Sequence, residues 1–175
     1  MSSRKICITA ADGQTGRLAA ELLLTHEQYS SKFQSLSLLA FAPEKCADLQ
    51  KLGGNKVSVI EYKSNPRQLL QTLQSEGCDT MFLIPPARED KVSVVKSLVD
   101  CAAAFKSLQN IVFLSSAGCD MAERDSEPAL RSFIDMETLV MKAKADVSAG
   151  STGHSPCIIR YLSRNPTLSP CSDIV

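Results

Sequence analysis

Short, almost unbroken apolar runs alternate along this chain with longer segments of helical periodicity. The apolar runs span residues 5–10, 35–42, 56–62, 79–84, 110–115 and 156–162, and the helical segments between them span 15–25, 43–52, 66–75, 88–105 and 129–145. Strands that are apolar along their whole length are expected where helices cover both faces of a sheet. Repeated β-α units favour a parallel sheet with right-handed crossovers. The alternation therefore predicts an α/β fold built on six strands.

Two of the helical segments carry an apolar stripe at intervals of three and four residues. Such spacing puts the stripe on one helical face, which can then pack against the sheet. Two other segments open with a proline, Pro43 and Pro66, at a position where the missing N–H would be unpaired in any case. The two stripes are Val92, Val95, Val99 and Ala102, and Phe133, Met136, Val140 and Ala143.

Length and charge limit the number of domains and the kinds of partner. At 175 residues the chain can bury one good core, and we place a single domain at residues 1–160. Residues 161–175 are rich in Ser and Pro, and we expect an irregular tail there. The formal net charge is zero, and no apolar run approaches the roughly 20 residues that span a bilayer. We therefore expect neither a nucleic-acid nor a membrane partner, and protein partners stay open.

Seven cysteines are spread along the chain. No two of them form a Cys-x-x-Cys pair, and no histidine lies near a pair in the spacing of a metal site. This pattern is typical of free thiols in a reducing compartment and not of a disulfide framework or a zinc centre. We expect a cytoplasmic protein without a structural metal, in which most cysteines act as small apolar core residues.

The strongest chemical signal lies between the first apolar run and the first helical segment. Residues 10–16 read Ala-Ala-Asp-Gly-Gln-Thr-Gly, with Ala10, Gly13 and Gly16 at the three positions of a dinucleotide-binding fingerprint. The second position lets the backbone approach a pyrophosphate, the third lets the helix pack on the strand, and the helix N-terminus directs N–H groups at the anion. The alternative is that the two glycines only shape a turn, and the missing first glycine leaves that alternative open.

Combined with the alternation, this loop predicts a Rossmann fold. We expect a doubly wound, mostly parallel six-stranded sheet in the order 3-2-1-4-5-6, with helices on both faces. In folds of this type a dinucleotide binds across the carboxyl ends of the strands, where the strand order reverses.

Four further segments follow the loop: Pro-Glu-Lys-Cys-Ala-Asp-Leu at 43–49, Gly-Cys-Asp-Thr-Met-Phe-Leu at 77–83, Ile-Val-Phe-Leu-Ser-Ser-Ala at 111–117 and Ile-Ile-Arg at 158–160. In this order and spacing the chain resembles the NmrA-like family of atypical short-chain dehydrogenases from about residue 5 to 160. The resemblance implies an NADP cofactor, with NAD as the alternative. It also implies hydride transfer to a small carbonyl, imine or quinone substrate.

The resemblance implies the cofactor-binding residues as well: Ala10, Asp12, Gly13, Gln14, Thr15, Gly16, Phe41, Lys45, Ile84 and Pro85. The family's arginine after the second strand, which reads the 2′-phosphate of NADP, is replaced by Phe41, and its aspartate after the third strand by Tyr62. Lys45 is placed to approach a 2′-phosphate, and Phe41 to stack on adenine. A solvated lysine and a packed phenylalanine are the alternatives.

Catalytic residues are poorly marked, so the catalytic set is unknown. No tyrosine is followed by a lysine four residues later, as in ordinary short-chain dehydrogenases. Glu137 matches a glutamate of NmrA-like enzymes, but the lysine one turn before it is missing. Ser115 and Ser116 remain as weak candidates, to bond a substrate carbonyl or the nicotinamide amide, with a simple turn as the alternative.

Three functional hypotheses follow. The first is an NAD(P)H-dependent oxidoreductase, and the second is a regulator that senses the dinucleotide without catalysis. The third is an inactive fragment, because the family continues into a substrate lobe whereas this sequence leaves the family pattern near Tyr161. Whether the protein is an enzyme stays open at this point.

Overall fold

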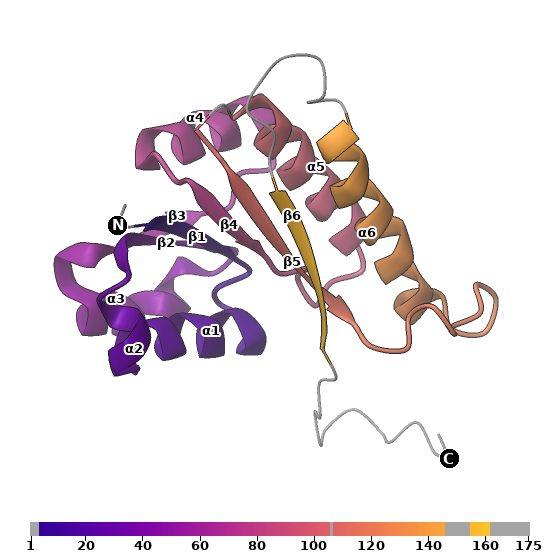
Figure 1. Ribbon diagram of the computed structural model, residues 1–175, viewed down its shortest axis with the longest axis horizontal. Helices are drawn as coiled ribbons and strands as arrows, with labels where there is room; N and C mark the ends of the chain where they lie inside the picture. Colours follow the sequence, from indigo (N-terminus) through magenta and orange to yellow (C-terminus); the bar gives the residue numbers. More distant parts are fainter. Residues whose placement is uncertain (1–3, 106, 146–154, 162–175) are drawn as a thin grey trace.

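A computed structural model describes residues 4–105, 107–145 and 155–161. Its six strands form one sheet in the order β3-β2-β1-β4-β5-β6 (Figure 1). Every pairing between neighbouring strands is parallel. The predicted fold class and strand order are therefore confirmed. The strands are β1 (Arg4–Thr9), β2 (Phe33–Ala40), β3 (Val57–Glu61), β4 (Thr80–Leu83), β5 (Asn110–Ser116) and β6 (Ser155–Tyr161).

Helices cover both faces of this sheet, as predicted (Figure 1). On one face lie α1 (Gln14–Thr25), the short α2 (Glu27–Ser30) and α3 (Ala47–Gly53), and on the other lie α4 (Pro66–Glu76), α5 (Lys91–Ala104) and α6 (Pro128–Ala145). Two 3-10 helices, η1 (Pro43–Cys46) and η2 (Gly54–Lys56), flank α3. None of the helices in the described part of the chain has the length and apolar character needed to cross a membrane.

The apolar core forms two layers, one on each face of the sheet. Both predicted stripes lie in the layer under α5 and α6. Their inner members are buried, and Val92 and Phe133, at the helix starts, are partly buried against the same layer. Burial of each valine or methionine side chain contributes about 1.5–3 kcal/mol and burial of an alanine contributes less, so these stripes hold the second helical layer on the sheet. The buried inner members are Val95, Val99, Ala102, Met136, Val140 and Ala143.

Two predicted helix boundaries differ from the structure. The segment predicted at 43–52 is divided into η1 and α3, with Pro43 in the first turn of η1. The segment predicted to begin at residue 88 begins at Lys91, because the N–H of Arg88 bonds the carbonyl of Pro86 at 2.9 Å in a turn. Arg88 therefore belongs to a loop at the carboxyl edge of the sheet and not to a helix.

The predicted domain boundary and tail fall mostly outside the described residues. Strand β6 runs to Tyr161, one residue past the predicted end of the domain, and residues 162–175 are not described. The cysteine side chains that are described are buried with free thiols, and they are Cys7, Cys46, Cys78, Cys101 and Cys119.

Thr9 connects the two strands between which the strand order reverses. The chain passes from β1 to β2 on one side of the sheet, whereas β4 and β5 lie on the other side of β1. The Thr9 hydroxyl donates to the carbonyl of Ile84 at 2.9 Å and accepts from the N–H of Ile84 at 2.8 Å. Because Thr9 is only 1 % exposed, water cannot replace these bonds. The pair fixes the spacing of the two strand ends where a crevice opens.

We predict that Thr9→Val destabilises the fold by about 2 kcal/mol or more, because it leaves both backbone groups of Ile84 buried without partners. Thr9→Ser is the matched control, since it keeps the hydroxyl and loses only a buried methyl group, which costs about 1 kcal/mol. Urea unfolding of the three proteins measures the difference. Equal stability of the Val and Ser variants would show that the two bonds do not hold the strand ends.

Candidate functional site

The loop between β1 and α1 folds tightly back on the end of β1. Ala10 has a φ of 49°, in the left-handed region that non-glycine residues enter at a cost of about 1–2 kcal/mol. The N–H of Gly13 donates to the carbonyl of Ala10 at 3.0 Å, and the N–H of Ala11 to the carbonyl of Leu39 at 3.1 Å. Ala10 thus adopts the strained turn for which the fingerprint normally uses a glycine. The turn forms without that glycine.

The first turn of α1 presents backbone N–H groups that no described residue accepts. The first bond of the helix runs from the N–H of Arg17 to the carbonyl of Gly13 at 2.9 Å. The N-cap residue, Gly13, supplies no side-chain bond, and the first turn contains no acidic residue. The amides of Gln14, Thr15 and Gly16 therefore have no acceptor within the described part of the chain. Together with the helix dipole they form a site that favours an anion.

The two glycines of the loop have different physical roles. A Cβ on Gly16 would lie 2.3 Å from the carbonyl oxygen of Ala10 and 2.9 Å from the Cα of Ala11, so the packing of α1 on β1 requires glycine there. A Cβ on Gly13 would meet only the Ala10 oxygen, at 3.2 Å, and Gly13 has an ordinary φ of −85°. Packing therefore accounts for the need for glycine at position 16, but it gives only a weak reason for glycine at position 13. Gly13 is exposed at the mouth of a pocket, where a missing side chain lets a ligand approach the backbone.

That pocket, here called the β2-side pocket, has a volume of about 410 Å³. The loop after β1, the chain after β2 and the loop after β4 surround it. It brings together five of the predicted cofactor residues with Arg88, a residue predicted to lie in a helix. The residues that line it are Ala10, Asp12, Gly13, Phe41, Ala42, Lys45, Pro86, Ala87 and Arg88.

Asp12 joins two walls of the β2-side pocket by hydrogen bonds. Its carboxylate accepts hydrogen bonds from the N–H of Phe41 at 3.2 Å and from the N–H of Ala42 at 3.1 Å. These bonds join the loop after β1 to the chain after β2, and so they fix the distance between two walls of the pocket. Bonds to a charged acceptor of this kind are the stronger ones in proteins.

Two residues that line the same pocket, Phe41 and Arg88, belong to an aromatic and cationic stack, with Tyr62 packed on Phe41 outside the lining. The Phe41 ring packs on the Tyr62 ring with centroids 4.6 Å apart, and the Arg88 guanidinium lies 4.9 Å from the Phe41 centroid. Asp90 holds Arg88 through its Nε and Nη2 atoms, and this hydrogen bonding raises the pKa of Arg88 further. A permanent positive charge therefore lies over Phe41, and exposed Lys45 lies on the same pocket.

A smaller cavity of about 110 Å³, here called the β5-side cavity, opens on the other side of β1. It joins the start of α1 to the ends of β4 and β5 and to α6. The structure thus brings the predicted Thr15, Ile84 and Pro85 together with both serine candidates. The lining residues are Thr15, Ile84, Pro85, Leu114, Ser115, Ser116 and Phe133.

Ser115 has a fixed hydrogen-bonding direction in the β5-side cavity. It is 4 % exposed, and its hydroxyl donates to Oε1 of Glu137 at 2.6 Å. The thiol of buried Cys119 contacts the same carboxylate oxygen at 3.7 Å. Because a hydroxyl has one hydrogen, Ser115 offers only its lone pairs to a ligand. It therefore suits the N–H of an amide better than a carbonyl oxygen, the other partner that the sequence left open.

The tyrosines and the histidine whose side chains are described lie elsewhere. Burial raises the pKa of the Tyr62 hydroxyl, and its ring belongs to the stack under Arg88. Tyr29 lies on α2 with its ring 4.7 Å from that of His26. Neither cavity is lined by these three side chains. Within the described ranges, no group of His, Cys, Asp or Glu is arranged to hold a metal ion.

We predict that Gly16→Ala lowers stability much more than Gly13→Ala does. Gly16→Ala should destabilise the protein by about 2 kcal/mol or more, because the new methyl group overlaps backbone atoms that cannot move aside. Gly13→Ala should change stability by less than about 1 kcal/mol, since the helix-cap penalty and the lost freedom of the unfolded chain partly cancel. Thermal and urea unfolding measure both values. A Gly13 variant as unstable as the Gly16 variant would mean that both glycines serve packing alone.

No protein-family model matches the chain, and no curated protein matches it in sequence. Solved structures do match it. The NADPH-dependent quinone oxidoreductase QOR2 of Escherichia coli, solved with NADPH, aligns with a TM-score of 0.64 and 20 % identity over 89 % of this chain and 48 % of that one. NmrA, a negative transcriptional regulator solved with NADP, aligns with a TM-score of 0.64 and 15 % identity over 91 % and 45 %. Pinoresinol-lariciresinol and phenylcoumaran benzylic ether reductases align with a TM-score of 0.65 and 13 % identity over 93 % and 50 %.

This chain spans about half the length of those proteins. At such low identity the likeness concerns the fold alone. The resemblance predicted from the order of the sequence segments is confirmed at this level. The chain has the same Rossmann fold as these solved structures, NmrA among them.

Proposed function

We propose that this chain binds NADP(H) along the carboxyl edge of its sheet. The free amides of Gln14, Thr15 and Gly16 would hold the pyrophosphate. The β2-side pocket would take the adenosine half, and the β5-side cavity would take the nicotinamide end. The observation that carries this proposal is the placement of the two cavities on either side of free helix-terminal amides. A dinucleotide needs this order of sites in a Rossmann fold.

The charges of the β2-side pocket favour NADP over NAD. Arg88 and Lys45 both line it. Asp90 accepts hydrogen bonds from Nε and Nη2 of Arg88. Nη1 has no acceptor within the described ranges, so it would donate to a 2′-phosphate. The Asp12 carboxylate, the acidic group nearest to an NAD ribose in this pocket, is engaged with the backbone after β2. Phe41 would offer adenine a flat apolar surface, with Arg88 beside it.

The activity that we propose is reduction of a small carbonyl, imine or quinone. A bound nicotinamide would supply the hydride. Ser115, with its proton committed to Glu137, would accept a hydrogen bond from the carboxamide and so orient the ring. The similarity in fold to a quinone oxidoreductase that was solved with NADPH supports this reaction class. The buried free thiols fit the cytoplasm as the proposed compartment.

A second candidate is a regulator that senses NADP(H) without chemistry. The specific observation in its favour is the same Ser115–Glu137 bond, because it removes the donor that would protonate a reduced carbonyl. Neither Tyr29 nor Tyr62 lines the β5-side cavity as a replacement donor. Similarity in fold to NmrA, a transcriptional regulator solved with NADP, also supports this candidate.

We predict that Arg88→Ala weakens NADPH binding roughly tenfold or more and NADH binding about threefold or less, because only NADPH carries the charge that Arg88 contacts. Isothermal titration with both cofactors gives the ratio. Arg124→Ala is the matched control, since Arg124 is also an exposed arginine paired with an aspartate, Asp135, away from both cavities. Equal weakening of NADPH and NADH by Arg88→Ala would contradict the 2′-phosphate role.

Turnover separates the two candidates. If the protein is a reductase, NADPH should be oxidised steadily in the presence of a quinone such as menadione, and Gly13→Ala should lower the rate at least tenfold. Absorbance at the reduced nicotinamide band follows the reaction, with Arg124→Ala again as the control. Tight NADPH binding without oxidation across a panel of quinones, aldehydes and imines would favour the regulator. Failure of the wild-type chain to bind either cofactor would contradict both candidates.

A further inference from the structure

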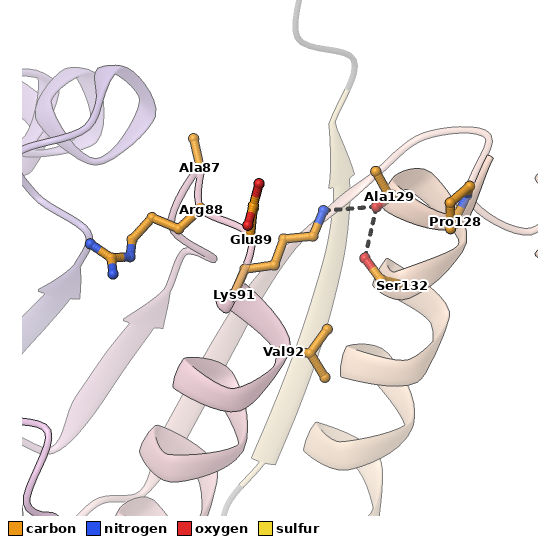
Figure 2. A pocket seen from close by; sticks show the side chains of 8 residues that line it. All are labelled: Ala87, Arg88, Glu89, Lys91, Val92, Pro128, Ala129 and Ser132. Carbon is orange, nitrogen blue, oxygen red and sulfur yellow. Dashed lines mark hydrogen bonds between the residues drawn. The ribbon is translucent and has the colours of Figure 1, made fainter.

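A third pocket lies next to the proposed cofactor site, between the start of α5 and the start of α6 (Figure 2). This α5–α6 pocket has a volume of about 600 Å³, which is ample for a small molecule of one or two rings. Val92, Pro128 and Ala129 give it apolar walls. Its polar lining consists of Lys91 and Ser132 on the two helices and of Arg88 and Glu89 in the loop before α5. The loop that carries Arg88 separates it from the β2-side pocket, because that loop lines both.

Lys91 is the central group of the α5–α6 pocket. Figure 2 shows its side chain extending from the first turn of α5 across to α6, where Nζ donates to the carbonyl of Ala129 at 2.7 Å. The same Nζ lies 4.6 Å from the centre of the Phe133 ring. The side chain is partly buried, and this burial lowers the pKa of the ammonium group. A lysine carries three N–H donors, so two of them remain after the bond to Ala129.

No carboxylate balances this charge within the described part of the chain. Lys91 takes part in none of the ion pairs found there. Glu89, on the pocket rim, forms no ion pair with it, and Asp90 is paired with Arg88. The Arg88 side chain runs away from Lys91 in Figure 2, toward its stack on Phe41. A partly buried cation with spare donors and no counter-ion favours binding of an anion.

Phe133 places Lys91 close to the reacting end of the proposed cofactor. One surface of its ring contacts the Lys91 ammonium, and the residue also lines the β5-side cavity with Ser115 and Ser116. Ser132, the preceding residue on α6, lines the α5–α6 pocket. The first turns of α6 therefore form a wall shared by the two cavities. A molecule held by Lys91 would lie next to the cavity that we assign to the nicotinamide.

We propose that the α5–α6 pocket binds a small, mostly apolar molecule that carries an anionic oxygen, such as an aromatic carboxylate, and that Lys91 bonds this oxygen. The further inference that this molecule is the substrate reduced by NADPH rests on the proposed function. Binding of the molecule itself does not, because every group that forms the pocket belongs to the chain.

The test uses two probes of nearly the same shape, 2-naphthoate and its neutral amide, 2-naphthamide. Their dissociation constants are measured by titration calorimetry or ligand-observed NMR on the full chain, with and without NADPH. Wild-type protein should bind the carboxylate at least tenfold more tightly than the amide. Lys91→Met should abolish that preference, by weakening the carboxylate about tenfold and the amide by less than about threefold. Lys91→Arg should retain most of the preference.

Two further variants are measured with the same probes. Ser132→Phe should fill the pocket and weaken both probes, and it replaces Lys91→Met as the decisive variant if the latter fails to fold. Lys96→Met is the control, because Lys96 lies on the same helix and pairs with Asp100 away from the pocket. No binding of either probe at millimolar concentration, or equal weakening of both by Lys91→Met, would overturn the proposal. Binding of 2-naphthoate that is unchanged by NADPH would contradict the substrate-side position and leave the anion site intact.

Discussion

The contact between Gly16 and the backbone of Ala10 and Ala11 determines where everything else in the site lies. No side chain fits at that contact, so the first turn of α1 lies directly against the end of β1. This approach leaves the amides of Gln14, Thr15 and Gly16, at the carboxyl edge of the sheet, without acceptors among the described residues. Helix-terminal amides of this kind are satisfied by water or by an anion. The fold thus creates an anion site as a consequence of its own packing.

The surrounding bonds hold the two cavities at fixed positions on either side of that anion site. The buried Thr9 hydroxyl joins the ends of β1 and β4, and the Asp12 carboxylate joins the loop after β1 to the chain after β2. The groups that each cavity offers to a ligand are different. The β2-side pocket carries Arg88 and Lys45, whereas the β5-side cavity offers the lone pairs of Ser115, whose proton goes to Glu137. In the binding mode that we propose, each half of NADP(H) would face a complementary surface.

The sequence predicted the fold well, because apolar runs and helical stripes reflect local periodicity that tertiary packing reinforces. It also located the loop at 10–16, since glycine spacing is a local signal. Arg88 was missed because its segment was assigned to a helix, although Pro85 and Pro86 just before it are a local signal against one. The bond between Ser115 and Glu137 and the reach of Lys91 across to Ala129 join residues 22 and 38 positions apart. No spacing rule marks such contacts, because they depend on how α5 and α6 pack on the sheet.

Two-dimensional ¹H–¹⁵N NMR of the labelled chain during an NADPH titration tests most directly whether free amides of α1 hold the pyrophosphate. We expect the amide signals of Gln14, Thr15 and Gly16 to move downfield with a common saturation curve, because each gains a charged acceptor. ADP-ribose, which keeps the pyrophosphate and lacks the nicotinamide, should move the same three signals. Saturable NADPH binding that leaves those three amides in place would contradict the assignment of the site.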